Sequence, residues 1–173
     1  MEKRLSITFG LLIGAMWAGQ ILIGNLGGTT VFGHLRDMHP RVYALGGWCA
    51  AGAVVLAGLA GLVAAYWTGR IPVALRVGVW SGLLSGGIVF VTLMSVVILF
   101  HGAMMGDPSN IHEFARTAHR VPAETELSSF LYRDALGSAL NHLWIGPLLG
   151  LTVGGIGSIF GKWQHDAEFA RRH

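Results

Sequence analysis

The stretch VGVWSGLLSGG, residues 77–87, decides the fold class of this chain, because it places Gly78, Gly82 and Gly86 four residues apart in an apolar run. Residues four apart lie on one face of a helix, so these glycines form a flat strip that another backbone can approach closely. In lipid, where apolar side chains gain little by burial against one another, such strips allow helices to associate. The stretch therefore predicts a packed membrane helix.

Three further apolar runs carry the same spacing. The strips consist of Gly10 and Gly14 with Ala18 in the first run, Ala53, Ala57, Gly61 and Ala65 in the second, and Gly146, Gly150, Gly154 and Ser158 in the last. The second and third runs each carry an additional pair, Gly47 with Ala51 and Ser81 with Ser85. This repetition predicts an all-α integral membrane protein, an antiparallel four-helix transmembrane bundle with more packing surface than one bundle needs.

The composition supports the membrane class and excludes several others. Of 173 residues, 53% are hydrophobic and 12% are charged, against about 25% charged in an average soluble domain. The net charge of +3 comes from basic residues scattered outside the apolar runs, so no nucleic-acid-binding patch is predicted. The single cysteine, Cys49, excludes an internal disulfide and is expected to be a small buried hydrophobe.

The runs predict four spans in a single domain of residues 1–173. Their expected bounds are about 6–26, 43–66, 77–101 and 140–160, each long enough to cross a hydrocarbon core of about 30 Å. The first run exceeds a signal-peptide core and lacks a cleavage motif, so we expect it to be retained. Trp48, Trp67, Trp144 and Trp163 fall near the predicted span ends, as an aromatic belt requires.

The distribution of basic residues predicts the orientation. Lys and Arg are denser in the terminal segments and the loop between spans two and three than in the other two loops. Cytoplasmic segments carry the excess of Lys and Arg, so both termini are expected in the cytoplasm, and the expected location is the bacterial inner (plasma) membrane.

The outer loop, residues 102–139, is long enough to hold structure of its own. Asp107-Pro108 is typical of a helix cap followed by proline at the first helical position, and Ile111 and Phe114 follow at helical spacing. A second start at Pro122 is expected to run on into the last span. The loop therefore predicts short amphipathic helices on the outer membrane surface or capping the bundle.

The polar residues within the spans indicate what the bundle can transport. Gln20, Asn25 and Thr92 are candidates for lining a pore or contacting a ligand, although Gln20 is first expected to hydrogen-bond to another helix. No Asp, Glu, Lys or Arg lies inside a predicted span, which argues against a carrier that translocates charge.

The histidines predict no metal site, because their spacing matches no ligand motif. His101 and His142, at the predicted outer ends of spans three and four, are candidates for the axial ligands of one b-type haem. Catalytic and phosphate-binding motifs are missing from the sequence, which favours a non-enzymatic role without excluding an enzyme.

Three functions remain open from the sequence. The first is a non-catalytic accessory or scaffold subunit that packs against other membrane chains, since the strips exceed the needs of one bundle. The second is a homo-oligomeric channel or small transporter for a neutral solute, and the third is a haem-binding redox anchor. The expected partners are the lipid bilayer and other membrane chains, or further copies of this chain.

Overall fold

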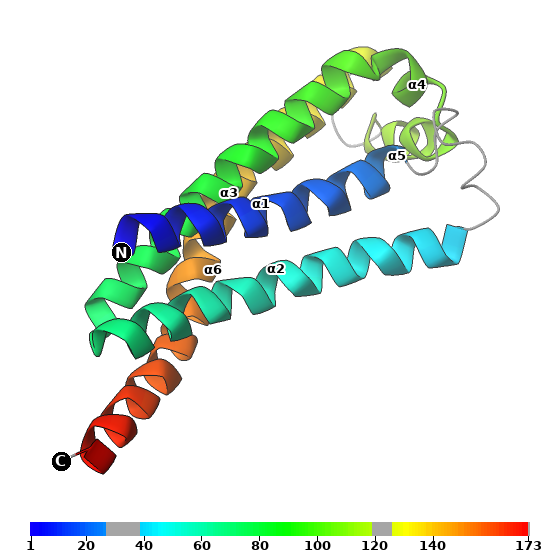
Figure 1. Cartoon of the computed structure of the whole chain (residues 1–173). Coiled ribbons are helices and arrows are strands. Elements are labelled where there is room, and N and C mark those ends of the chain that lie inside the picture. The colour runs from blue at the N-terminus through cyan, green and yellow to red at the C-terminus, as the bar shows by residue number, and fades with distance from the viewer. Residues whose placement is uncertain (27–38, 119–125, 173) are drawn as a thin grey trace.

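The computed structural model describes residues 1–26, 39–118 and 126–172, and it confirms the predicted all-α class. Within these ranges the chain forms helices and contains no strand. The four long helices are α1 (Glu2–Leu26), α2 (His39–Thr68), α3 (Ile71–Leu99) and α6 (Leu127–Arg172), and the two short ones are α4 (His101–Met105) and α5 (Pro108–Ala118) (Figure 1).

Each long helix is long and apolar enough to cross a membrane. In α2 the segment that qualifies is Ala44–Thr68, and the other three qualify over their full described lengths. The four helices correspond to the four apolar runs, so the predicted number of candidate spans agrees with the structure.

The turn between α2 and α3 is tighter than the predicted connection of residues 67–76. The helix α2 continues to Thr68, whose hydroxyl donates to the carbonyl oxygen of Ala64 at 2.6 Å. Gly69 then adopts a positive φ of 64°, which only glycine adopts without strain, and α3 begins at Ile71. The chain therefore reverses direction within three residues.

The last helix differs most from the prediction, because α6 starts at Leu127 and not near residue 140. The predicted start at Pro122 lies outside the described residues, and from Leu127 the helix runs into the last span without a break. Pro147 therefore lies deep inside a 46-residue helix, not in its first turns. As a further consequence, Trp144 lies two residues from the Gly146–Gly82 contact near the middle of α3, not at a span end.

The long helices form a ring in the order α1, α3, α6, α2, with each helix packed against the next. Along α3 and α6 the contacts run in opposite register, since Gly78 meets Gly150 and Gly82 meets Gly146. At the end of the ring near the turn between α2 and α3, Ala60, Ala64 and Ala65 are fully buried.

The short helices cover the end of the ring opposite the two termini (Figure 1). Asp107 caps α5 as predicted, because its Oδ1 accepts a hydrogen bond from the backbone N–H of Ser109 at 2.8 Å. Phe114 of α5 packs edge-on against Phe130 of α6, with ring centroids 5.6 Å apart. Larger side chains fill the core at this end, among them Leu26, Val96, Val97, Met104 and Leu131.

Candidate functional site

The glycine strip of α3 packs directly on the strip of α6. A Cβ built on Gly82 would collide with the carbonyl oxygen of Gly146, and a Cβ on Gly146 would collide with that of Gly82. Gly78 and Gly150 face each other in the same way, and Gly86 lies against the backbone of His142. The two backbones touch, so no larger residue fits at these positions without moving a helix.

The other predicted strips also pack within the chain. Gly61 of α2 lies on the backbone of Gly154, whose own nearest neighbour across the interface is the carbonyl of Ala57. On α1, Gly10 packs against the side chain of Leu84 and Gly14 against the side chain of Ile88. The contacts of α1 with α3 are therefore made by α3 side chains, whereas α6 contacts the α3 backbone. These strips are therefore contacts inside one chain.

The additional strip on α3 is also internal. Ser81 and Ser85 are buried, and their hydroxyls donate to the carbonyls of Gly78 at 3.0 Å and Gly82 at 2.9 Å. The expectation that both additional strips were surplus packing surface is therefore wrong for α3. The sequence could not distinguish the two cases, because serine is small enough for either a buried or an exposed helix face.

The additional strip on α2 is exposed. A Cβ on Gly47 would meet no described atom within 4 Å, and Ala51 one turn later is also exposed. Trp48, which is 75% exposed, lies beside them. In the first half of α2 the glycines that do make contacts, Gly46 and Gly52, meet side chains of α1, whereas Gly58, further along the helix, meets Val153 of α6.

Gln20 of α1 lies against Gly46, the buried residue that precedes this exposed strip on α2. Its Cγ would be 3.9 Å from a Cβ on Gly46, so the side chain sits between α1 and α2. The Gln20 side chain is half-buried, and no hydrogen bond joins its amide to another residue in the described part of the chain. The predicted cross-helix hydrogen bond is not formed among the described residues.

The other two candidate pore residues bond to their own helices. Asn25 donates from Nδ2 to the carbonyl of Ile21 at 2.9 Å, and Thr92 donates from its hydroxyl to the carbonyl of Ile88 at 2.9 Å. Both polar groups are therefore satisfied locally, as hydroxyls and amides in membrane helices often are.

The centre of the bundle is closed. All four long helices meet around a cavity of about 10 Å³, lined by residues that include Ile13, Trp17, Ala57, Ser85 and Leu149. A space of this size is at the lower limit for one water molecule. Gln20, Asn25 and Thr92 do not line it, so the three residues do not mark a path through the middle of one chain.

The structure does not bring His101 and His142 together. His101 stacks on Tyr132 at a centroid distance of 5.1 Å, and its Nε2 lies 3.2 Å from the hydroxyl of Ser128. His142 bonds through Nδ1 to the carbonyl of Ser138 at 2.8 Å. Ser128 and His142 are 14 positions apart on α6, or about 21 Å along the axis, which is too far for two ligands of one haem iron. The early start of α6 is the reason the two histidines lie at different depths.

Two carboxylates, Glu113 and Asp134, have shifted pKa values at the described end of the chain that carries α5. Arg116 donates to Glu113 at 2.7 Å, and this hydrogen bond lowers the pKa of Glu113. Burial raises the pKa of Asp134, and the nearby charge of Glu113 adds to the effect. Among the described residues, no three His, Cys, Asp or Glu side chains cluster as metal ligands, while His34 and His119 lie outside those residues.

One contact at the opposite end had no signal in the sequence. The last turns of α6 contact the end of α2. The Tyr66 hydroxyl donates a hydrogen bond to Glu168 at 2.8 Å, and Nδ1 of His165 bonds to the carbonyl oxygen of Tyr66 at 2.7 Å. The imidazole lies over Gly69 in the turn. Residues a hundred positions apart cannot be paired by local sequence patterns.

Neither a protein-family model, nor a curated protein, nor a solved structure matches this chain. Three features of the described residues bear on function: the closed centre, the exposed strip on α2 and the unpaired amide of Gln20.

Proposed function

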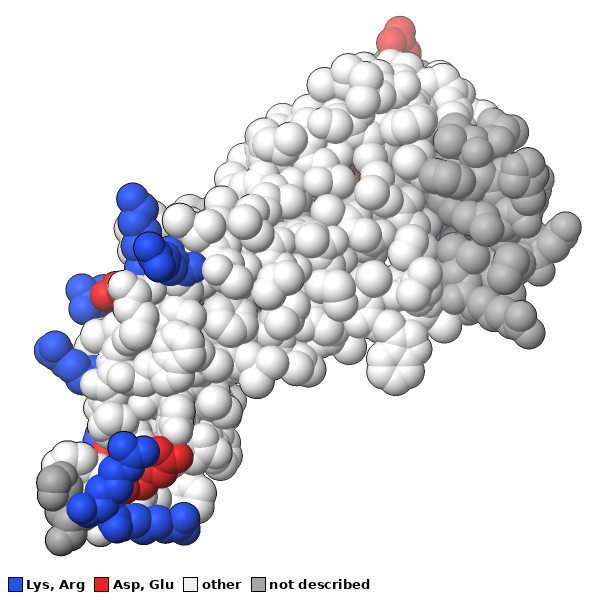
Figure 2. Space-filling view, viewed as in Figure 1, with Lys and Arg blue, Asp and Glu red and all other residues white. Residues whose placement is uncertain are grey.

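We propose that the chain is inserted in the bacterial inner membrane as an antiparallel four-helix bundle with both termini in the cytoplasm. The four helices that are long and apolar enough to span a bilayer support this proposal. In Figure 2 the Lys and Arg side chains in view gather at the end that carries both termini, and the long middle of this face is free of them. This distribution is typical of cytoplasmic ends of membrane proteins.

Within that membrane, the chain acts as a non-catalytic accessory subunit that packs against another membrane chain. The observations that carry the proposal are the amide of Gln20, which has no hydrogen bond among the described residues, and the exposed strip of Gly47 and Ala51 on the neighbouring helix. An unpaired polar group in hydrocarbon costs several kcal/mol, so a donor or acceptor from a second helix would stabilise the complex there. The open strip lets a second backbone come close enough to supply one.

The size of the purified complex, measured by light scattering in a mild detergent, tests this function. We expect a particle that contains a second protein chain, either another copy or a different subunit, and we expect Gly47→Ile to reduce it to a single chain. The variant places a branched side chain where the strip requires a flat surface, at a position whose Cβ would meet no described atom of its own chain within 4 Å.

Ala15→Ile is the matched control, because Ala15 is a small exposed residue on α1 outside the strip. It should leave the particle unchanged. If the wild-type chain purifies as a stable monomer, or if both variants change the particle equally, the proposed function is wrong.

A further inference from the structure

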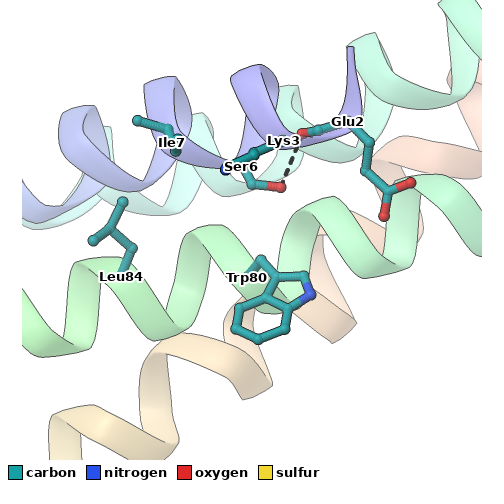
Figure 3. A pocket seen from close by; sticks show the side chains of 6 residues that line it. All are labelled: Glu2, Lys3, Ser6, Ile7, Trp80 and Leu84. Atoms are coloured by element: carbon teal, nitrogen blue, oxygen red, sulfur yellow. Dashed lines mark hydrogen bonds between the residues drawn. The ribbon is translucent and has the colours of Figure 1, made fainter.

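A groove runs between α1 and α3 at the end of the bundle that carries both termini (Figure 3). Its volume is about 570 Å³, within the range of about 300–1,000 Å³ that is typical of small-molecule sites. The residues that line it are Glu2, Lys3, Ser6, Ile7, Trp80 and Leu84. The groove is separate from the exposed strip on α2.

The body of the groove is apolar and open to the surroundings. Ile7 and Trp80 are 44% and 60% exposed, and Leu84 lies on α3 one turn from Trp80 and across from Ile7 of α1 (Figure 3). The hydroxyl of Ser6 donates to the carbonyl of Glu2 at 3.1 Å, so it is already satisfied and offers the groove little polarity. Such a surface suits a hydrocarbon chain lying along the helices.

The mouth of the groove carries an excess of positive charge. Arg76 lies 3.4 Å from the carboxylate of Glu2, so this pair partly cancels, while no ion pair of Lys3 or Arg4 occurs among the described residues. Lys3 and Arg76 thus stand against the one carboxylate of Glu2, while Arg4 lies in the same turn as Lys3 but does not line the groove. Trp80 adds an indole N–H, which has no acceptor in the described part of the chain. The edge of the indole that carries this N–H points toward the Glu2 end of the groove (Figure 3).

We infer that this groove binds an anionic phospholipid of the cytoplasmic leaflet. One acyl chain lies against Ile7 and Leu84, and the phosphate lies at the mouth beside Lys3, within reach of the indole N–H of Trp80. Basic pockets between membrane helices on the cytoplasmic side recognise anionic headgroups in this way. The charge at the mouth favours a lipid over a second apolar helix, which would bring no negative charge to it. The inference rests on the membrane insertion proposed above, but not on the proposed subunit partner.

Native mass spectrometry of the full chain in detergent tests the inference, with phosphatidylglycerol and phosphatidylcholine of identical acyl chains as probes. We expect phosphatidylglycerol to bind more tightly than phosphatidylcholine. Lys3→Gln should weaken phosphatidylglycerol binding about fivefold, the effect expected for one basic residue near an anionic headgroup. Arg4→Gln is the matched control, because it removes the same charge from the same turn, at a residue that does not line the groove. Its effect on phosphatidylglycerol binding should be clearly smaller.

A second pair of variants tests the groove itself. Ile7→Trp fills it and should displace the lipid, whereas Leu12→Trp, at a similarly exposed position of α1 outside the groove, should not. Equal losses for Lys3→Gln and Arg4→Gln with no effect of Ile7→Trp would show general surface attraction and overturn the inference. Equal binding of the two lipids, or a second copy of the chain held through Ile7, would also overturn it. Loss of lipid binding with an intact complex leaves the subunit proposal standing, and the reverse result leaves the lipid site standing.

Discussion

Gly82 and Gly146 touch backbone to backbone, so that the hydrogen each carries in place of a side chain is all the space between α3 and α6 allows. The contact lies near the middle of both helices and next to Pro147, whose ring nitrogen faces Gly82. Proline donates no backbone hydrogen bond, so the helix α6 is held at this point by its close fit to α3. The strips of small residues are therefore the core of this protein.

Gly82→Ala should destabilise the bundle by about 1–3 kcal/mol, the usual cost of overpacking, because the new methyl group meets backbone atoms that cannot rotate away. Gly87→Ala is the matched control: it lies on the same helix and its Cβ would meet no described atom within 4 Å. It should be neutral or stabilise by up to about 1 kcal/mol through helix propensity. Reversible unfolding in mixed detergent micelles measures both, and equal effects would contradict the packing described.

Gly69→Ala should destabilise the turn between α2 and α3 for two separable reasons. A left-handed backbone costs a non-glycine residue about 1–2 kcal/mol, and the new Cβ would lie 2.8 Å from Nε2 of His165. In a His165→Ala background the second cost disappears and the first remains, so the penalty should shrink without vanishing. A double-mutant cycle on the unfolding free energy measures this coupling, and additive effects would show that His165 does not lie against Gly69.

The stability of the outer end should depend on the charge of Asp134. Its pKa is raised from the ordinary value of 3.8, so the folded state holds the proton more tightly than the unfolded state. The folded state therefore loses stability as the pH rises from below 3.8 through the raised pKa. Asp134→Asn should raise the unfolding temperature at neutral pH and change it little at the acidic end of the titration.

The charge of Glu113 supplies part of this shift, after burial. Glu113→Gln should therefore move the pKa of Asp134 back toward its ordinary value, and carboxyl NMR titration follows that change directly. A titration of Asp134 that is unaffected by Glu113→Gln would show that α5 does not hold Glu113 near α6.

The proposed orientation can be tested with cysteine labelling in a Cys49→Ala background. Glu126→Cys, before α6, should react with a membrane-impermeant maleimide in intact cells, whereas Gln164→Cys, near the other end of α6, should react only after the cells are opened. Both side chains are exposed, so their reactivity reports the side of the membrane. The opposite labelling pattern would show that the termini lie outside the cytoplasm.

Much of the fold could be predicted from the sequence because its signals are local. The glycine spacing and the long apolar runs indicate four helices, and the Asp107 cap predicts the start of α5. The sequence also predicts a helix start at Pro122 that runs on into the last span, and from Leu127 the structure has one unbroken helix. The level at which α6 packs on α3 could not be predicted, because it depends on contacts between distant residues.

The site was less predictable, because its properties depend on which face of a helix is covered. The predicted span of 140–160 placed His142 at the same end of the spans as His101, and this placement made the two histidines candidates for haem ligands. Similarly, the strip of Ser81 and Ser85 and the strip of Gly47 and Ala51 have equivalent spacing, yet one is buried and the other exposed. Only the tertiary arrangement distinguishes a strip that is buried within the chain from one that stays exposed.

Gln20→Leu should weaken association with the proposed partner, since it removes an amide that has no hydrogen bond among the described residues and that a second helix could bond. Thr92→Val is the matched control, because the Thr92 hydroxyl already bonds to its own helix. Dilution of the detergent-solubilised complex, followed by size-exclusion chromatography, should show earlier dissociation for Gln20→Leu alone. Dissociation that is unchanged in this variant would exclude Gln20 from the interface.

The number of protein chains in a particle extracted with its native lipid, without detergent, tests the central claim most directly. Mass measurement of such particles should find this chain together with at least one further chain, and Gly47→Ile should remove that chain while the four helices stay folded. A wild-type particle that contains one copy of this chain and no other protein would contradict the account.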